Sequence, residues 1–440
     1  MVRISPTATA EKHQTPTADN PPAQPNLPSL ARFLQLPGGA QYVDAETATG
    51  LSEPRVPPAA TNKIVRVALL LPMTGTNADL GKAMLNAAQL AVFDFADRNL
   101  ELLMFDTRGS AAAAAAAVAA AIGDGISVVI GPLLASSVRA VAPAARAAQV
   151  PVVAFSSDHT VVGDGVYTLG FLPEDQVRRV VSFASSRGVA KFAVLAPDNA
   201  YGATVTEIAR QTAARVFGEV THVQYYDPNA EDFTPAVRAL ADYDARRQAL
   251  VMQRKQLEKL DDPVSIQALK RLKNLQTIGD LPFEALLIAD GGKRLISIAA
   301  LLPFYDIDPA KVRMLGTGQW DVAGIGAEPA LLGGWYAAPP LAARQAFEAQ
   351  YRKTYGKSSP RLATLAYDVT ALISVLARVE GGPDFSRDRL VTASGFEGRD
   401  GIFRFLPSGV AERGLAVMQV RKKDVGVISP APTTFETVIN

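Results

Sequence analysis

The chain has 440 residues, of which 48% are hydrophobic and 20% are charged; this composition is typical of a globular protein, and the length is too great for one compact core. Its 44 basic and 43 acidic side chains nearly cancel, which argues against binding to nucleic acid or anionic lipid through overall charge. Cysteine is absent and only three histidines occur, which excludes disulfides, thiol nucleophiles, thiolate metal sites and a histidine-rich metal site.

Residues 1–61 differ in composition from the rest of the chain, because ten prolines occur there among Thr, Ala, Gln and Asn. Such a segment buries too little apolar area to offset its ordering entropy, so we expect a mostly disordered tail. Its opening residues contain neither the apolar stretch of a signal peptide nor a lipobox cysteine. No apolar run in the chain approaches the roughly 18 to 20 residues that span a bilayer.

A first series of alternating elements begins near Lys63. Short apolar, β-branched runs predict strands over 64–71, 100–105, 126–131 and 150–155, and helical spacing predicts helices over 80–96, 111–121 and 135–148. Such a β-α-β series is typical of a parallel sheet covered by helices on both faces.

A second series follows residue 170 and predicts a second α/β lobe. Its expected strands are 191–197, 220–226, 284–289 and 312–318, and its expected helices are 174–187, 201–217, 232–248 and 292–302. The remaining chain adds a strand over 333–339, helices over 341–355 and 361–380, and a β ribbon that pairs 401–405 with 414–420.

Residues 244–280 interrupt this pattern. Leucines recur there at helical spacing on both sides of an Asp-Asp-Pro turn at 261–263, and basic side chains outnumber acidic ones. We expect a charged helical hairpin that projects from the second lobe. It is either a solvated insertion or a docking surface for another protein.

No signature of an enzyme or of a cofactor site occurs in the sequence. The phosphate-binding GxxxxGK[ST], the metalloprotease HExxH, the hydrolase GxSxG and a strand-linked GxGxxG are all missing. His159 has Ser156, Ser157 and Asp158 as sequence neighbours, but a catalytic triad converges from separate elements. We therefore predict a protein that is not an enzyme and that has no catalytic residue, metal or cofactor.

Polar residues follow the carboxyl ends of six expected strands, which is where open α/β sheets bind ligands. Ser136 and Ser137 lie at a helix start, where they can cap the helix or meet an anion. Three carboxylates could pair with an ammonium group: Asp158, Asp290 and Asp321. Tyr201 and Trp320 could supply apolar walls.

Three segments resemble the Leu/Ile/Val-binding-protein-like family, which has the type I periplasmic binding fold. They are 65–94, 125–158 and PDNAYG at 197–202, and the overall likeness covers about 63–425. The resemblance implies an α/β fold with two doubly wound parallel-sheet lobes, the Venus-flytrap arrangement, joined by three crossovers near 170–174, 335–340 and 403–408. The lobes would then be 62–171 with 338–404, and 172–337 with 405–430.

A finer likeness is to the alphaproteobacterial penicillin-binding protein activators, which stimulate peptidoglycan synthases. It rests on 240–247, 304–321, 333–340 and 400–420. This likeness implies a non-enzymatic regulator in the periplasm or cell envelope that docks on a peptidoglycan synthase. The alternative is the substrate-binding receptor of an ABC transporter, which would work with a permease and bind amino acids or similar small polar ligands in a cleft between the lobes.

The family resemblance also implies roles for individual residues. Ser136 and Ser137 would meet a ligand carboxylate, with Ser157 and Asp158 beside them. Tyr201 would stack on the ligand from the other lobe. Gln319 lies near the position where amino-acid-binding members place an acid for the ammonium group, with Asp321 two residues further on.

Overall fold

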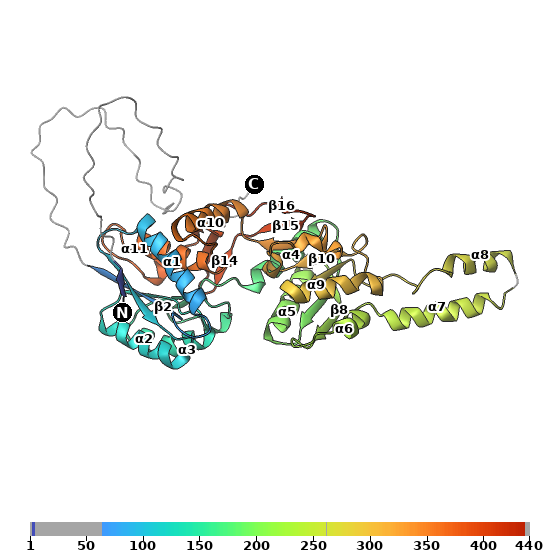
Figure 1. The fold of residues 1–440 in the computed structure, drawn as a ribbon, viewed down its shortest axis with the longest axis horizontal. Coiled ribbons are helices and arrows are strands. Elements are labelled where there is room, and N and C mark those ends of the chain that lie inside the picture. The colour runs from blue at the N-terminus through green and yellow to red at the C-terminus, as the bar shows by residue number, and fades with distance from the viewer. Residues whose placement is uncertain (1, 5–63, 261, 436–440) are drawn as a thin grey trace, which may run out of the picture. The chain divides into compact units, whose positions relative to one another are not determined.

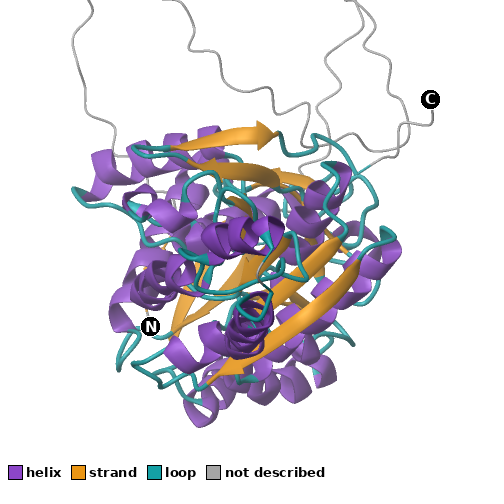
Figure 2. Cartoon of the chain, turned by 90° about the vertical axis from the view of Figure 1, so that its right-hand side faces the viewer, coloured by secondary structure: helices purple, strands orange, loops and turns teal. Residues whose placement is uncertain are grey.

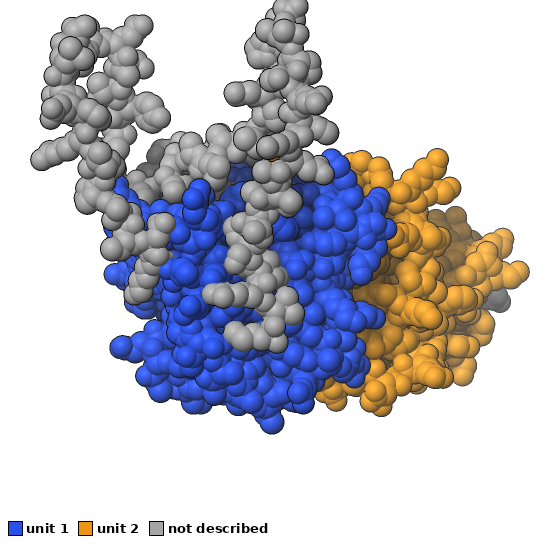
Figure 3. All heavy atoms as spheres, turned by 60° about the vertical axis from the view of Figure 1, so that its left-hand side comes forward, with its two compact units in different colours: residues 1–171, 341–414, 433–440 blue, residues 172–340, 415–432 orange. Residues whose placement is uncertain are grey.

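The computed structural model describes residues 2–4, 64–260 and 262–435, which form two compact units. Unit 1 comprises 1–171, 341–414 and 433–440, and unit 2 comprises 172–340 and 415–432 (Figure 3). The chain therefore leaves unit 1 after Phe171, returns at Leu341 and leaves again after Gly414. Most of the predicted disordered tail lies outside the described residues.

Unit 1 is built on a six-stranded sheet with the order β1-β3-β2-β4-β5-β6. Its parallel strands are β2 (Val65–Leu71), β3 (Leu100–Asp106), β4 (Val128–Ile130), β5 (Val152–Ala154) and β6 (Val166–Thr168). The edge strand β1 (Val2–Ile4) pairs antiparallel with β3, so these three residues, predicted to belong to the disordered tail, add a strand to the sheet. Strand β6 was not predicted, because its three residues are too few to show a period.

Helices cover both faces of this sheet, and the alternation along β2 divides its side chains between two cores. Val67, Leu69 and Leu71 pack with α1 (Ala78–Phe95), α10 (Leu341–Tyr355) and α11 (Ala363–Leu376). Ala68 and Leu70 pack with α2 (Ala111–Gly123) and α3 (Ala135–Ala147) on the opposite face. Burial on both faces explains why β2 is an unbroken apolar run.

Unit 2 contains a seven-stranded sheet with the order β16-β15-β11-β10-β9-β7-β8. Five strands are parallel: β7 (Lys191–Pro197), β8 (Glu219–Tyr226), β9 (Ala285–Ile288), β10 (Arg313–Gly316) and β11 (Trp335–Ala338). Helices α4 (Pro173–Ser186) and α5 (Ala200–Arg215) pack on its core, while α6 (Thr234–Leu240) contacts β7, β8 and α9 (Gly292–Leu301) (Figure 1). Figure 2 shows helices, in purple, beside the strands, in orange. The predicted fold class, two parallel α/β lobes, is confirmed.

The predicted ribbon between 401–405 and 414–420 is wrong. Strand β13 (Gly401–Phe405) pairs instead with β12 (Phe396–Gly398) and β14 (Ala411–Arg413) in a separate three-stranded sheet of unit 1. A tight turn, in which Leu406 and Val410 share a backbone hydrogen bond, brings β14 to β13 first. Strand β15 (Ala416–Val420) pairs with β11 and β16 (Val425–Ser429), so the third passage between units comes after Gly414 and not near 403–408.

The predicted helix over 232–248 is two helices. Asp242 has a left-handed backbone (φ 46°), which ends α6 and starts α7 (Tyr243–Leu257). Helix α7 and α8 (Pro263–Leu272) form a hairpin that extends away from the unit 2 sheet, as predicted for 244–280 (Figure 1). Leu250 and Leu272 are buried there, and the Arg254 guanidinium donates to the carbonyls of Leu272 and Leu275 at 2.5 and 3.0 Å.

Candidate ligand-binding site

The two parallel sheets share one topology, and this topology fixes where a ligand site can form. In each unit the first strand of the series stands beside the second on one side and the third on the other, so the strand order reverses between β2 and β4 and between β7 and β9. Loops that leave the carboxyl ends of strands at such a reversal diverge and leave room for a ligand. Among the predicted site residues, Ser136 and Ser137 follow β4, Tyr201 follows β7 and Asp290 follows β9, all at these reversals. The others follow the adjacent strands β5 and β10: Ser157, Asp158, Gln319 and Asp321.

In unit 1, helix α3 begins beside the reversal point with an open N-terminus. Its N-cap position is Leu134, and no side chain caps the first turn. Ser136 is exposed, whereas Ser137 is only 1% exposed and its hydroxyl has no hydrogen-bond partner among the described residues. Helix α2, in contrast, is capped by Ser110, whose hydroxyl accepts from the Ala113 amide at 3.2 Å. The free amides and positive dipole end of α3 favour a negatively charged group.

Ser157 and Asp158 follow β5 on the neighbouring loop. Ser157 is exposed, but Asp158 is already engaged, because the Arg139 guanidinium lies 2.6 Å from Oδ2 and both the amide and the hydroxyl of Thr160 donate to Oδ1. The Thr160 hydroxyl, together with the charge of Arg139, lowers the pKa of Asp158. Asp158 is therefore an ionised carboxylate that orders its own loop. The structure shows no free carboxylate for an ammonium group at this position.

In unit 2, Tyr201 starts α5 after the carboxyl end of β7. Its hydroxyl lies 3.0 Å from that of Thr317, which follows β10. Burial, with a contribution from the charge of Asp290, raises the pKa of Tyr201 to about 12. The phenol therefore stays protonated at every physiological pH and can act as a donor.

Asp290 lies two residues after β9, is 1% exposed and has four donors. Tyr226 and Arg294 Nε donate to Oδ2 at 2.5 and 2.8 Å, while the Gly291 amide and Arg294 Nη2 donate to Oδ1 at 2.7 and 3.1 Å. A carboxylate offers about four acceptor positions, so Asp290 has none left for a ligand ammonium. The group that this site exposes is the guanidinium of Arg294, whose side chain is half exposed.

Gln319, Trp320 and Asp321 lie on the turn after β10. Gln319 is exposed, and Trp320 is fully buried against Gly316, where a methyl group would come within 2.1 Å of the indole. Trp320 is thus a core residue and not an exposed wall. Asp321 Oδ1 lies 3.5 Å from the Tyr336 hydroxyl.

Sequence reasoning missed Arg139, Tyr226, Arg294 and Thr317. Arg294 stands four residues after Asp290 at the start of a helix, a spacing that could have suggested the ion pair. The other three meet their partners only through tertiary packing. Among the described residues, no group of His, Asp and Glu side chains could hold a metal ion.

Comparison with known proteins agrees with this topology. A family model for periplasmic binding proteins matches residues 64–424. The chain belongs to the periplasmic binding protein family. Members of this family are non-enzymatic, and membership implies the periplasm or cell envelope. None of the described helices is both long and apolar enough to cross a bilayer.

The solved structures that resemble this periplasmic binding protein share its fold at low identity. A putative branched-chain amino acid ABC transporter protein from Rhodospirillum rubrum is 17% identical, with a TM-score of 0.66, and covers 83% of this chain and 99% of its own. The transporter protein LivJ from Streptococcus pneumoniae, in complex with isoleucine, is 18% identical (TM-score 0.55; 84% and 100% covered). A solute-binding protein from Rhodopseudomonas palustris, in complex with benzoate, is 17% identical (TM-score 0.54; 84% and 97%).

A sequence relative gives no further functional assignment. An uncharacterised protein of Rickettsia prowazekii is 20% identical over 179 residues, which are 41% of this chain and 48% of that protein, so the match spans about half of its length. The structures named above support the predicted type I periplasmic binding fold. None of them is a penicillin-binding protein activator, and that finer likeness stays a prediction.

Proposed function

We propose that this protein is the solute-binding receptor of a transporter and that it binds a small ligand through a carboxylate at the N-terminus of α3. The observation that carries the proposal is the buried Ser137 hydroxyl, which has no partner at an uncapped helix start. A bound carboxylate would accept from this hydroxyl and from the first-turn amides, so it would remove an unmade hydrogen bond. Ser136, which precedes Ser137 in the sequence, and Ser157, on the loop after the neighbouring strand β5, are exposed and offer further donors.

The hydrogen bonds that Asp158 and Asp290 already accept narrow the class of ligand that can bind. Asp290 has no acceptor position left, and three donors already meet Asp158, so neither is prepared to receive an ammonium group. The ligands crystallised with two of the structural neighbours, isoleucine and benzoate, have a carboxylate in common. We therefore expect the carboxylate, and not an α-amino group, to be the feature that the receptor requires.

Ser137→Ala tests this proposal. The substitution removes a hydroxyl that makes no hydrogen bond, so the free energy of unfolding should change by less than about 0.5 kcal/mol, while affinity for a carboxylate ligand should fall about tenfold. A thermal-shift panel of aliphatic and aromatic carboxylates, with their amides as neutral analogues, would identify the ligand. Calorimetry would then compare the variants.

Ser110→Ala is the matched control, because it removes a serine that does cap a helix. It should cost about 1 kcal/mol of stability and leave ligand affinity unchanged. Equal affinity in wild type and Ser137→Ala would reject the carboxylate contact. If no carboxylate in the panel raises the melting temperature of protein that is free of co-purified ligand, the receptor function itself is rejected.

A second candidate function, docking to a partner such as a peptidoglycan synthase, is favoured by the α7–α8 hairpin. Six of its large apolar side chains are exposed: Val251, Met252, Leu260, Val264, Ile266 and Leu275. On α7, helical spacing places Val251 and Met252 on the same outer face as Lys255, and Lys259 lies in the turn after the helix. A basic, partly apolar helix face suits a partner groove that is apolar with an acidic rim.

A further inference from the structure

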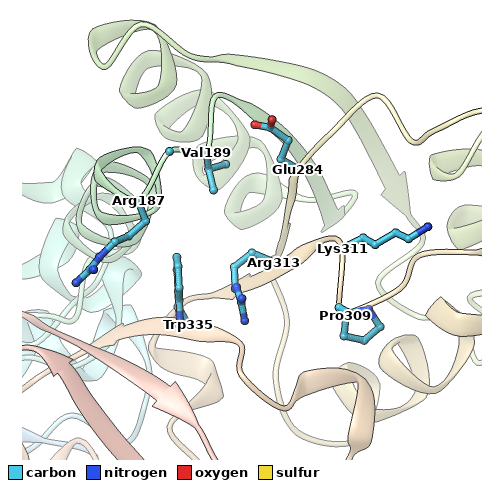
Figure 4. A pocket seen from close by; sticks show the side chains of 9 residues that line it. Arg187, Val189, Glu284, Pro309, Lys311, Arg313 and Trp335 are labelled. Carbon is cyan, nitrogen blue, oxygen red and sulfur yellow. The ribbon is translucent and has the colours of Figure 1, made fainter.

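Unit 2 has a pocket of about 330 Å³ at the amino ends of its parallel strands, the edge opposite Tyr201 and Asp290. Arg313 and Trp335 are the first residues of β10 and β11, and Glu284 immediately precedes β9. Arg187 follows α4, and Lys311 lies on the loop before β10. Figure 4 shows Arg313 and Trp335 side by side, with Arg187 and Lys311 toward opposite sides.

The lining of this pocket is positively charged. Arg187, Lys311 and Arg313 contribute three cations, and Glu284 is the one acidic lining residue. Glu284 is already used, because its Oε2 accepts from the backbone amides of Ala190 and Lys191 at 2.7 and 3.0 Å, which lower its pKa. In the part of the chain that the structure describes, no carboxylate lies within ion-pair distance of the three cations.

Aromatic rings hold the two arginines in place. The Arg313 guanidinium lies 4.7 Å from the centre of the Trp335 ring, and Trp335 meets Phe183 edge to face at 5.1 Å. The Arg187 guanidinium lies over the Phe183 ring, 5.1 Å from its centre. Arg313 also donates to the Gly333 carbonyl at 2.7 Å, and burial lowers its pKa.

A half-buried guanidinium with one acceptor has several N–H groups left without partners. Arginine carries five donors in a fixed fork, and this fork matches the geometry of a carboxylate or phosphate. Burial of a cation without an anion costs free energy, which an anion in the pocket would recover. The pocket is also large enough for more than a bare inorganic ion.

We propose that this pocket is a second ligand site, separate from the receptor site, that binds the oxyanion of a small organic carboxylate or phosphate. Arg313 forms the half-buried part of the site, and the exposed side chains of Arg187 and Lys311 flank the anion on either side. The Trp335 ring forms the wall against which the rest of the ligand packs.

Tryptophan fluorescence of the full chain can test the site. The sequence has two tryptophans, of which Trp320 is fully buried and Trp335 lines the pocket, so occupancy should change the Trp335 emission. Inorganic phosphate and acetate should each give a saturable change, whereas chloride at equal ionic strength should not. The tighter of the two anions identifies the headgroup that the site prefers.

The double variant Arg187→Gln/Lys311→Gln should bind the preferred anion at least tenfold more weakly. The matched control Lys422→Gln/Lys423→Gln removes two exposed cations from the turn after β15 and should bind as wild type does. Ser137→Ala should also leave this binding unchanged, which separates the pocket from the proposed receptor site. The proposal would be overturned if neither anion gave a saturable fluorescence change. It would also be overturned if the double variant bound the anion as tightly as wild type, or if the control variant lost as much affinity as the double variant.

Discussion

Asp368 is a carboxylate in the core of unit 1 whose charge the fold does not fully compensate. It lies on α11, is 3% exposed, and accepts from the Arg399 amide at 2.7 Å. Asp400 nearby is fully buried, pairs with Arg361 at 2.9 Å and accepts from the Thr364 hydroxyl. Burial, and after it the charge of Asp400, raises the pKa of Asp368 to about 7.

This raised pKa predicts a pH dependence of stability. Below about pH 4 Asp368 is protonated in both the folded and unfolded chain, but between pH 4 and 7 only the unfolded chain ionises, so stability falls as pH rises through this range. Asp368→Asn stays neutral and escapes this loss. At pH 8 it should be more stable than wild type by on the order of 4 kcal/mol, because the pKa rises from 3.8 to about 7 and one pKa unit corresponds to about 1.4 kcal/mol.

Urea unfolding of both proteins at pH 4.5 and pH 8, values chosen to lie at about the two ends of this range, would measure the effect. Asp384→Asn is the control of opposite sign, because hydrogen bonds from Ser386 lower the pKa of Asp384. Its removal should destabilise the protein more at high pH than at low pH. A stability difference between Asp368→Asn and wild type that does not change with pH would contradict the assignment.

At the scale of elements, the local sequence sufficed wherever a segment had a clear period. The apolar run of β2 and the helical spacing of apolar residues in α1 predicted these two elements correctly. A strand buried on both faces gives a continuous apolar run, whereas a helix buried along one side gives apolar residues three or four positions apart. The pairing of β13 was mispredicted, because a three-residue partner such as β14 carries no period. Topology placed the candidate residues at strand ends, but the partners that engage Asp158 and Asp290 depend on tertiary packing.

The α7–α8 hairpin gives a prediction at this scale for the docking function. Replacement of 244–280 by a short Gly/Ser loop should leave circular dichroism of the remaining fold intact, since Leu250 and Leu272 pack within the hairpin. Capture of a purified peptidoglycan synthase should be lost. Val251→Ser/Met252→Ser should also reduce capture, whereas Gln248→Ser/Gln253→Ser, an equal change at polar positions, should not. Capture that survives the loop replacement would exclude the hairpin as the docking surface.

At the scale of the whole molecule, neither unit is made from one continuous segment. One face of the unit 1 sheet is covered by α1 together with α10 and α11, and the last two helices follow most of unit 2 in the sequence. Phe347, Tyr351 and Tyr367 from these helices complete the core that begins with Val67, Leu69 and Leu71. The first 171 residues therefore lack about half of the buried residues on this face of their own sheet, because 16 of the 34 buried residues in this core lie between 347 and 411.

Residues 64–171 produced alone should then show no cooperative thermal unfolding and should expose apolar surface that binds a hydrophobic dye. The same residues joined through a flexible linker to 341–414 should unfold cooperatively, because α1 regains α11 as its packing partner. Differential scanning calorimetry of the two chains makes the comparison. Cooperative unfolding of 64–171 alone would contradict this prediction and would mean that α1, α2 and α3 cover the sheet well enough without α10 and α11.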